Sequence, residues 1–209
     1  MNYYLQKNLR AKISLRLKKY YVLHHPDRAK YNFIHINKCG GTSVYTALGQ
    51  KYKLHDLAIE RKIQIGNAWG NAFNFSIVRN PYARLISLYR YQVHKGYIAN
   101  TVDTDFETWL IKLFLQPIEN ENKKWRMYLT QCAWIMFDNK FLLDRVYKLE
   151  ELPLFWNEIL SNCKKSYRPL KRLNSLATNE DYNLTSNEQN IINKVFAHDF
   201  EVLKYPKRK

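Results

Sequence analysis

The chain has 209 residues, of which 46% are hydrophobic and 15% aromatic, a composition typical of one folded domain rather than a disordered segment. Its 34 Lys plus Arg outnumber 18 Asp plus Glu, so the formal net charge is +16 and an anionic ligand, substrate or surface is expected. The cysteines Cys39, Cys132 and Cys163 are odd in number and widely spaced. This spacing argues against a disulfide framework or a zinc site and favours a reducing compartment.

Residues 1–30 are predicted to form a basic N-terminal extension. They contain eight Lys or Arg and only Asp27 as an acid. Such a segment is either a solvated helical face or a patch that contacts anionic lipid or glycan. No apolar run approaches the roughly 18 residues of a membrane span, and the N-terminus lacks the apolar block of a signal peptide. We therefore expect a cytoplasmic protein, with peripheral contact at the inner membrane face left open.

The rest of the chain alternates predicted strands and helices without repeats or linkers. Short apolar runs predict strands at residues 31–36, 73–78 and 145–149. Helices are predicted from residue 42 and at about 57–65, 81–93, 105–115, 152–161 and 186–203, with capping boxes at Thr104–Glu107 and Thr185–Glu188. The pattern predicts a single α/β domain of the P-loop-like kind, with a central parallel sheet and helices on both faces.

The first informative motif is the loop after the first strand, "NKCGGTS". Gly40 and Gly41 allow a sharp turn, and the free N–H groups of the helix that follows favour a phosphate or sulfate. Lys38 precedes the glycines, whereas in the common magnesium-binding nucleotide loop the lysine follows them. The alternative is an ordinary strand-to-helix turn capped by Thr42 or Ser43.

The second informative motif, "VRNPYARLISLY", follows the second strand. The strand delivers Arg79 to its carboxyl end, and the next helix carries Arg84, Ser87 and Tyr91 on one face. Arg79 is expected to present a planar fork to a phosphate. Taken alone, Arg84 or Arg90 is expected to be a solvated surface charge. Both motifs begin at the carboxyl ends of predicted parallel strands, which is where open parallel sheets bind ligands.

These two motifs resemble those of the sulfotransferases that use 3′-phosphoadenosine 5′-phosphosulfate (PAPS), and within them the carbohydrate type related to heparan sulfate 2-O-sulfotransferases and their bacterial relatives. "MYLTQCAWI", "RVYKLEELPLFWNEI" and "FAHDFEVLKY" resemble later segments of the same family. The resemblance implies a sulfotransferase domain at residues 31–205, followed by a basic tail at 206–209. A high content of Asn, Lys, Ile and Tyr suits a bacterium with an AT-rich genome.

The resemblance also implies roles for individual residues. Lys38 would steady charge on the leaving phosphate, while Arg79 and Ser87 would hold the 3′-phosphate. PAPS would be the donor and adenosine 3′,5′-bisphosphate (PAP) the product, with no metal required. The family usually has a basic residue soon after the Leu-Asn of "RLNSLATNEDYNL", and this chain has none between Asn174 and Lys194. The residues assigned to the donor site are Lys38, Cys39, Gly40, Gly41, Thr42, Ser43, Arg79 and Ser87.

A carbohydrate hydroxyl on a glycan, capsule or lipid-linked sugar is the expected acceptor. The segments expected to contact it, about residues 93–103 and 116–130, contain Lys95, Lys123, Lys124 and Arg126, most of which are expected to be surface charges. Two alternatives stay open. One is a P-loop-type kinase or phosphotransferase, and the other is a non-enzymatic basic module that binds glycan or nucleic acid; the sequence contains no nucleic-acid-binding motif.

A histidine is the expected base for the acceptor proton, since its ordinary pKa of about 6.5 lies near working pH. His55 is the first candidate because many members of the resembling family have a histidine between the two donor motifs. It could instead cap or pack beside Asp56. His94, at the end of the helix that carries Ser87, is the second candidate, and Glu60 or Asp56 would follow if both histidines failed.

Overall fold

The structure is a computed structural model that describes residues 30–50, 55–98, 104–116, 125–171 and 182–208. The described elements, in chain order, are β1 (Tyr31–Ile34), α3 (Gly41–Ala47), α4 (Ala58–Ile65), the 3₁₀ helix η1 (Gly66–Asn71), β2 (Phe73–Val78), α5 (Pro81–His94), α6 (Phe106–Leu110), the π-helix η3 (Ile111–Leu115), the 3₁₀ helix η4 (Trp125–Tyr128), α7 (Gln131–Ile135), β3 (Met136–Phe137), β4 (Lys140–Phe141), β5 (Arg145–Lys148), the 3₁₀ helix η5 (Leu149–Glu151), α8 (Leu152–Asn162), α9 (Ser186–Val195) and α10 (Ala197–Val202).

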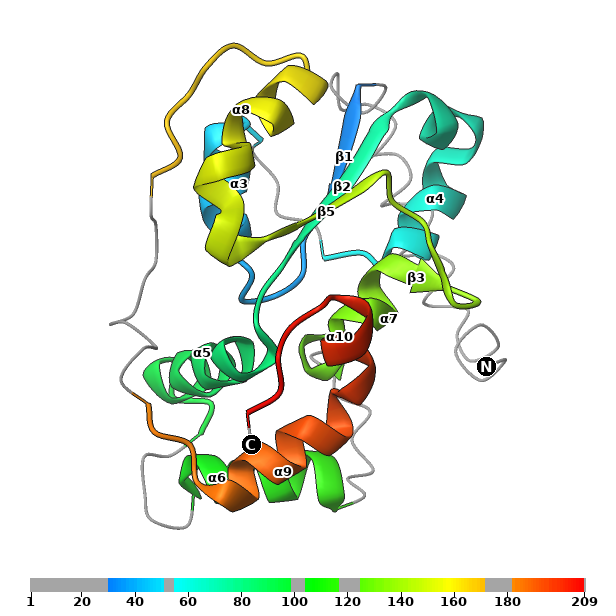
Figure 1. The fold of residues 1–209 in the computed structure, drawn as a ribbon. Helices are drawn as coiled ribbons and strands as arrows, with labels where there is room; N and C mark the ends of the chain where they lie inside the picture. Colours follow the sequence, from blue (N-terminus) through cyan, green and yellow to red (C-terminus); the bar gives the residue numbers. More distant parts are fainter. Residues whose placement is uncertain (1–29, 51–54, 99–103, 117–124, 172–181, 209) are drawn as a thin grey trace.

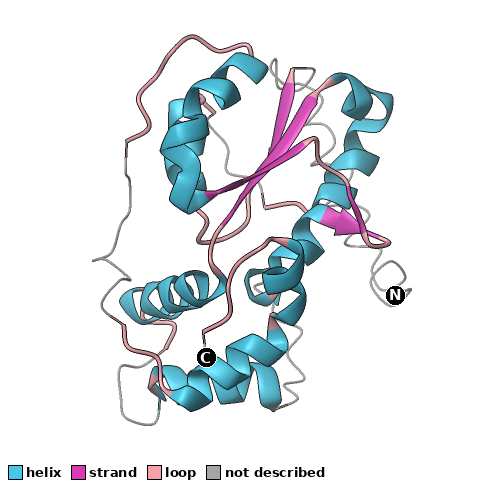
Figure 2. Ribbon diagram, in the orientation of Figure 1, coloured by secondary structure: helices cyan, strands magenta, loops and turns pink. Residues whose placement is uncertain are grey.

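A three-stranded parallel sheet in the order β1-β2-β5 forms the centre of the fold, as predicted. Helices α3 and α8 lie on one side of it and α4 on the other, while α5, α6, α7, α9 and α10 gather beyond the carboxyl ends of the strands (Figures 1 and 2). β1 is buried throughout and β2 nearly so, which explains their almost continuous apolar character. The fold class and the three predicted strands are confirmed.

Aromatic stacking and buried polar contacts set the register of the sheet. Phe33 pairs with Phe75 across β1 and β2, and their ring centroids lie 5.0 Å apart. The Ser76 hydroxyl donates to the carbonyl oxygen of Ile34 over 2.7 Å. Asn32 donates to the Asn74 side chain over 2.9 Å. These contacts hold β1 and β2 so that their carboxyl ends lie side by side.

Two predicted helical features differ from the structure. The single helix expected at residues 186–203 is broken at Phe196 into α9 and α10, because Phe196 has φ −105° and ψ 23°. The expected Thr104–Glu107 capping box is absent: Asp105 caps α6 instead, and Glu107 accepts hydrogen bonds from Thr185 and Asn187. The Thr185–Glu188 capping box is confirmed.

Several sequence expectations fall outside the described residues. These are the first 29 residues of the basic N-terminal extension, Lys123 and Lys124, and most of the "RLNSLATNEDYNL" segment. Within the described part of the chain, the helices are all too short or too polar to cross a membrane.

Candidate active site

The loop between β1 and α3 is a tight turn that depends on glycine at two positions. Gly40 has φ 73°, in the left-handed region that glycine adopts at little cost, and Lys38 also has a positive φ of 69°. A Cβ atom on Gly41 would lie 1.9 Å from the His35 ring, so a side chain there would collide with it. The turn thus leads residues 40 and 41 directly into the first turn of α3, and the N-terminal turn of a helix favours an anion.

Lys38 and Arg79 come together at the ends of neighbouring strands. Arg79 directly follows β2, and its Nη1 donates to the carbonyl oxygen of Lys38 over 3.3 Å. Burial, and next the charge of Arg79, lower the pKa of the Lys38 ammonium from its ordinary value. The charge of Arg79 thus acts on the Lys38 ammonium, and two positive charges that repel each other favour an anionic ligand.

The Lys38 side chain reaches along α5. Its Nζ lies 4.4 Å from the centroid of the Tyr91 ring, a cation–π contact. Ser87 lies one turn before Tyr91 on the same helical face and is half-buried. Thr42 and Ser43, also half-buried, begin α3. The assigned residues therefore lie on the loop after β1, at the end of β2, and on the two helices, α3 and α5, that follow these strands.

Cys39 differs from its neighbours in the loop because its side chain faces the interior. It is 1% exposed, and its thiol donates to Oε1 of Gln131 over 3.3 Å. Burial raises the pKa of Cys39 to about 12. Any contact of Cys39 with a donor would therefore come from its backbone. All three cysteines are free thiols and buried.

Arg84 is a buried structural residue, and the expectation of a solvated charge was wrong. It is 1% exposed and donates to three backbone carbonyl oxygens, those of Asn37, Leu129 and Met127, over 3.2, 2.9 and 3.0 Å. These bonds join the loop after β1 to the segment before α7. In the sequence, Arg84 differs from a surface arginine only in sharing a helical face with Ser87, and this did not predict that it is buried.

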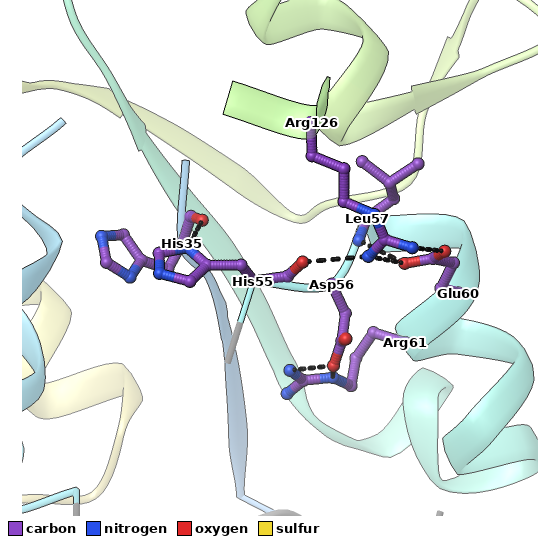
Figure 3. Close-up of polar contacts among 7 residues, drawn as sticks. All are labelled: His35, His55, Asp56, Leu57, Glu60, Arg61 and Arg126. Carbon is purple, nitrogen blue, oxygen red and sulfur yellow. Dashed lines mark hydrogen bonds and ion pairs between the residues drawn. The ribbon is translucent and has the colours of Figure 1, made fainter. Parts of the chain in front are cut away.

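His55 lies beside the loop, in contact with His35 (Figure 3). The two ring centroids are 4.4 Å apart, and Nδ1 of His55 lies 3.3 Å from the carbonyl oxygen of His35. A proton on Nδ1 satisfies that carbonyl and makes Nε2 the basic nitrogen. Because the His35 ring also abuts Gly41, one imidazole separates His55 from the loop.

Two ion pairs surround His55 and involve the carboxylates named as further candidates for the base (Figure 3). Asp56 accepts from Arg61 over 2.8 Å, and both side chains are at most 2% exposed. Glu60 accepts from both Nη atoms of Arg126, over 2.9 and 2.6 Å, and from the backbone N–H of Leu57. Both carboxylates are thus held by arginines, which makes them weaker candidates than His55.

Arg126 connects the predicted acceptor segment to the histidine. Besides binding Glu60, its Nη1 donates to the backbone carbonyl oxygen of His55 over 3.1 Å. It is only 27% exposed, so it is not a plain surface charge. His94, in contrast, is exposed at the last position of α5, one turn beyond Tyr91. In the described residues, no cluster of three or more His, Cys, Asp or Glu side chains is placed to hold a metal ion.

The sulfotransferase family model matches residues 24–206 of this chain. Because the match covers most of the chain, the protein belongs to the sulfotransferase family and transfers sulfuryl groups. The mixed α/β fold with its central parallel sheet agrees with that family. Comparison with curated proteins gave no match, and neither did comparison with solved structures.

Proposed function

We propose that the protein transfers the sulfuryl group of PAPS to a hydroxyl of a carbohydrate acceptor. One observation carries the proposal: Lys38 and Arg79, from the two motifs that resemble the donor-binding motifs of the family, converge at the carboxyl ends of β1 and β2. Their separation along the chain is 41 residues, so only the fold brings them together. The site lies where open parallel sheets bind ligands.

The residues present fit a donor with two separate anionic groups. The backbone of residues 40 and 41, the hydroxyls of Thr42 and Ser43, and Lys38 would hold the 5′-phosphosulfate. Arg79 and Ser87 would hold the 3′-phosphate, and PAPS would supply the sulfuryl group. Lys38 stabilises the negative charge that develops on the leaving phosphate, a role that demands position and charge more than covalent chemistry.

His55 is the proposed base. Its Nδ1 contact with the His35 carbonyl oxygen orients the ring, and Nε2 takes the proton from the acceptor hydroxyl as that oxygen becomes the nucleophile. Arg126 supports this position because it holds the backbone carbonyl oxygen of His55. His94 is the second candidate, since Lys38 reaches the turn of α5 that precedes it.

The proposal of a carbohydrate acceptor rests on two points. The motifs resemble those of the carbohydrate type of sulfotransferase, and the net charge of +16 suits an anionic polymer. Cytoplasmic location, peripheral membrane contact through residues 1–30, and the boundaries of the domain stay predictions.

The direct experiment is a transfer screen with radiolabelled PAPS over neutral glycans, anionic glycans, phenols and peptides, with Lys38→Ala and His55→Ala as matched controls. We expect label in at least one glycan with the wild-type protein and strongly reduced label with both variants. Transfer only to phenols or peptides would overturn the carbohydrate acceptor but leave the donor assignment standing. Transfer at wild-type rate by Lys38→Ala would overturn the assigned site.

A further inference from the structure

Gln131 joins the two donor-binding segments through its side-chain amide. It begins α7, is completely buried, and lies against both strand ends. Its Oε1 accepts the backbone N–H of Arg79 over 2.8 Å, and its Nε2 donates to the backbone carbonyl oxygen of Arg79 over 2.7 Å. The same Oε1 accepts the Cys39 thiol over 3.3 Å. One amide therefore contacts the residue after β2 and the loop after β1.

The chemistry of these contacts requires an amide. Arg79 offers one backbone donor and one backbone acceptor, and only Asn or Gln presents both complements in a single planar group. A carboxylate would accept the N–H but leave the Arg79 carbonyl oxygen without its donor. Leaving a buried polar group unsatisfied is costly, so this contact constrains Arg79 strongly.

Gln131 is itself held in place from α10. Asp199, completely buried, accepts the backbone N–H groups of Gln131 and Cys132 over 2.8 and 2.9 Å. Thr130 accepts the N–H of Ala133 over 3.3 Å. The first N–H groups of α7 therefore have fixed partners, and the Gln131 side chain projects from a fixed base.

We propose that Gln131 is a positioning residue that sets the spacing between the Arg79 segment and the Lys38–Gly41 loop. This assignment rests on the proposed function. If Arg79 binds the 3′-phosphate while the loop binds the 5′ group, one nucleotide fits both only at the correct spacing. Gln131 thereby determines the preference for a 3′,5′-bisphosphate over a 5′-monophosphate without contacting either.

The test compares affinities for PAP and adenosine 5′-phosphate in the wild-type protein, in Gln131→Met and in Gln92→Met. Gln92 is a matched control: it is a buried glutamine whose amide bonds Tyr128 and Trp109, away from both strand ends. We expect both variants to lose thermal stability. Only Gln131→Met should lose preference for PAP, by about tenfold, because the Arg79 backbone loses both hydrogen bonds that fix it and the loop loses its contact with the amide.

A purely structural role predicts lower melting temperature in Gln131→Met with an unchanged ratio of the two affinities, and that result would overturn this assignment alone. Failure of the wild-type protein to bind PAP would overturn the proposed function and this assignment with it. If Gln131→Met does not fold, the two affinities are compared in Gln131→Asn instead. Its amide is one methylene too short to keep all three contacts, so the same loss of preference for PAP is expected.

Discussion

The imidazole rings of His35 and His55 lie against each other, with their centroids 4.4 Å apart, although 20 residues separate them in the chain. His35 follows β1 and its ring also touches Gly41, so it stands between the loop and His55. Through this ring, the position of the proposed base depends on the loop that would hold the donor.

Replacing His55 tests the proposed base. His55→Ala should lower kcat by roughly 10²–10⁴ while affinity for PAP stays nearly unchanged, because the histidine acts on the acceptor proton and not on the donor. Steady-state transfer rates and PAP titrations measure the two quantities. His94→Ala is the control, and loss of turnover in that variant with wild-type turnover in His55→Ala would move the role to His94.

Gly41→Ala should disturb catalysis through His35. The added methyl group would lie 1.9 Å from two atoms of the His35 ring, so the ring must move and His55 must follow. We expect kcat to fall by about tenfold to a hundredfold, since a displacement of about 1 Å is enough for such a loss. Gly70→Ala is the matched control, because a Cβ atom there meets nothing within 4 Å. Equal, small effects of the two substitutions would show that the close packing at Gly41 is unimportant.

Arg84 should contribute to stability. Arg84→Met removes three hydrogen bonds from a buried guanidinium to backbone carbonyl oxygens, so the free energy of unfolding should fall by about 2–4 kcal/mol. Urea denaturation measures the change. Arg145→Met, at a largely exposed arginine, should change the same quantity by about 0.5 kcal/mol or less. A loss below about 1 kcal/mol in Arg84→Met would contradict the structural role.

The pH dependence of turnover should report on Lys38. Burial and the charge of Arg79 lower its pKa from 10.5, so the ammonium loses its proton at a lower pH than an ordinary lysine. If the ammonium stabilises the leaving group, kcat at saturating donor should fall as pH rises through this lowered pKa. In Arg79→Gln one of the two causes is gone, and the fall should move to higher pH. A shift to lower pH, or none, would contradict this coupling.

The same pKa shift affects stability in a defined direction. Because the folded-state pKa of Lys38 lies below its unfolded value, the charged form disfavours folding at neutral pH, and this cost disappears above the unfolded pKa. Lys38→Met should therefore keep or raise the melting temperature at neutral pH while it abolishes turnover. A marked loss of stability in that variant would show that the Tyr91 contact outweighs the burial cost.

Short-range patterns were sufficient to predict much of the fold. The three strands of the central sheet were predicted because each is a short run of branched and aromatic residues, and α5 because Asn80 and Pro81 mark its start. The hairpin β3–β4 was missed, although Asp138 and Asn139, both with positive φ, form its turn. The break at Phe196 was missed because apolar periodicity continues through it.

The supporting contacts of the site were beyond sequence reasoning because they join distant segments. Arg84 and Gln131 act through backbone carbonyl and N–H groups, which every residue has, so neither partner shows a distinctive pattern. Arg126 likewise reaches back 71 residues to the carbonyl oxygen of His55. The donor residues stay a prediction, which rests on two motifs that resemble those of the family and are each continuous in the sequence.

The most direct test of the central claim is metal-free calorimetric titration of the protein with PAP and with adenosine 5′-phosphate, beside a separate titration with ATP and magnesium. We predict that the wild-type protein prefers PAP. Arg79→Ala and Ser87→Ala should each weaken PAP binding about ten- to a hundredfold and adenosine 5′-phosphate binding much less, because only PAP has the 3′-phosphate. Equal weakening of both nucleotides, or binding of ATP with magnesium but not of PAP, would contradict the account.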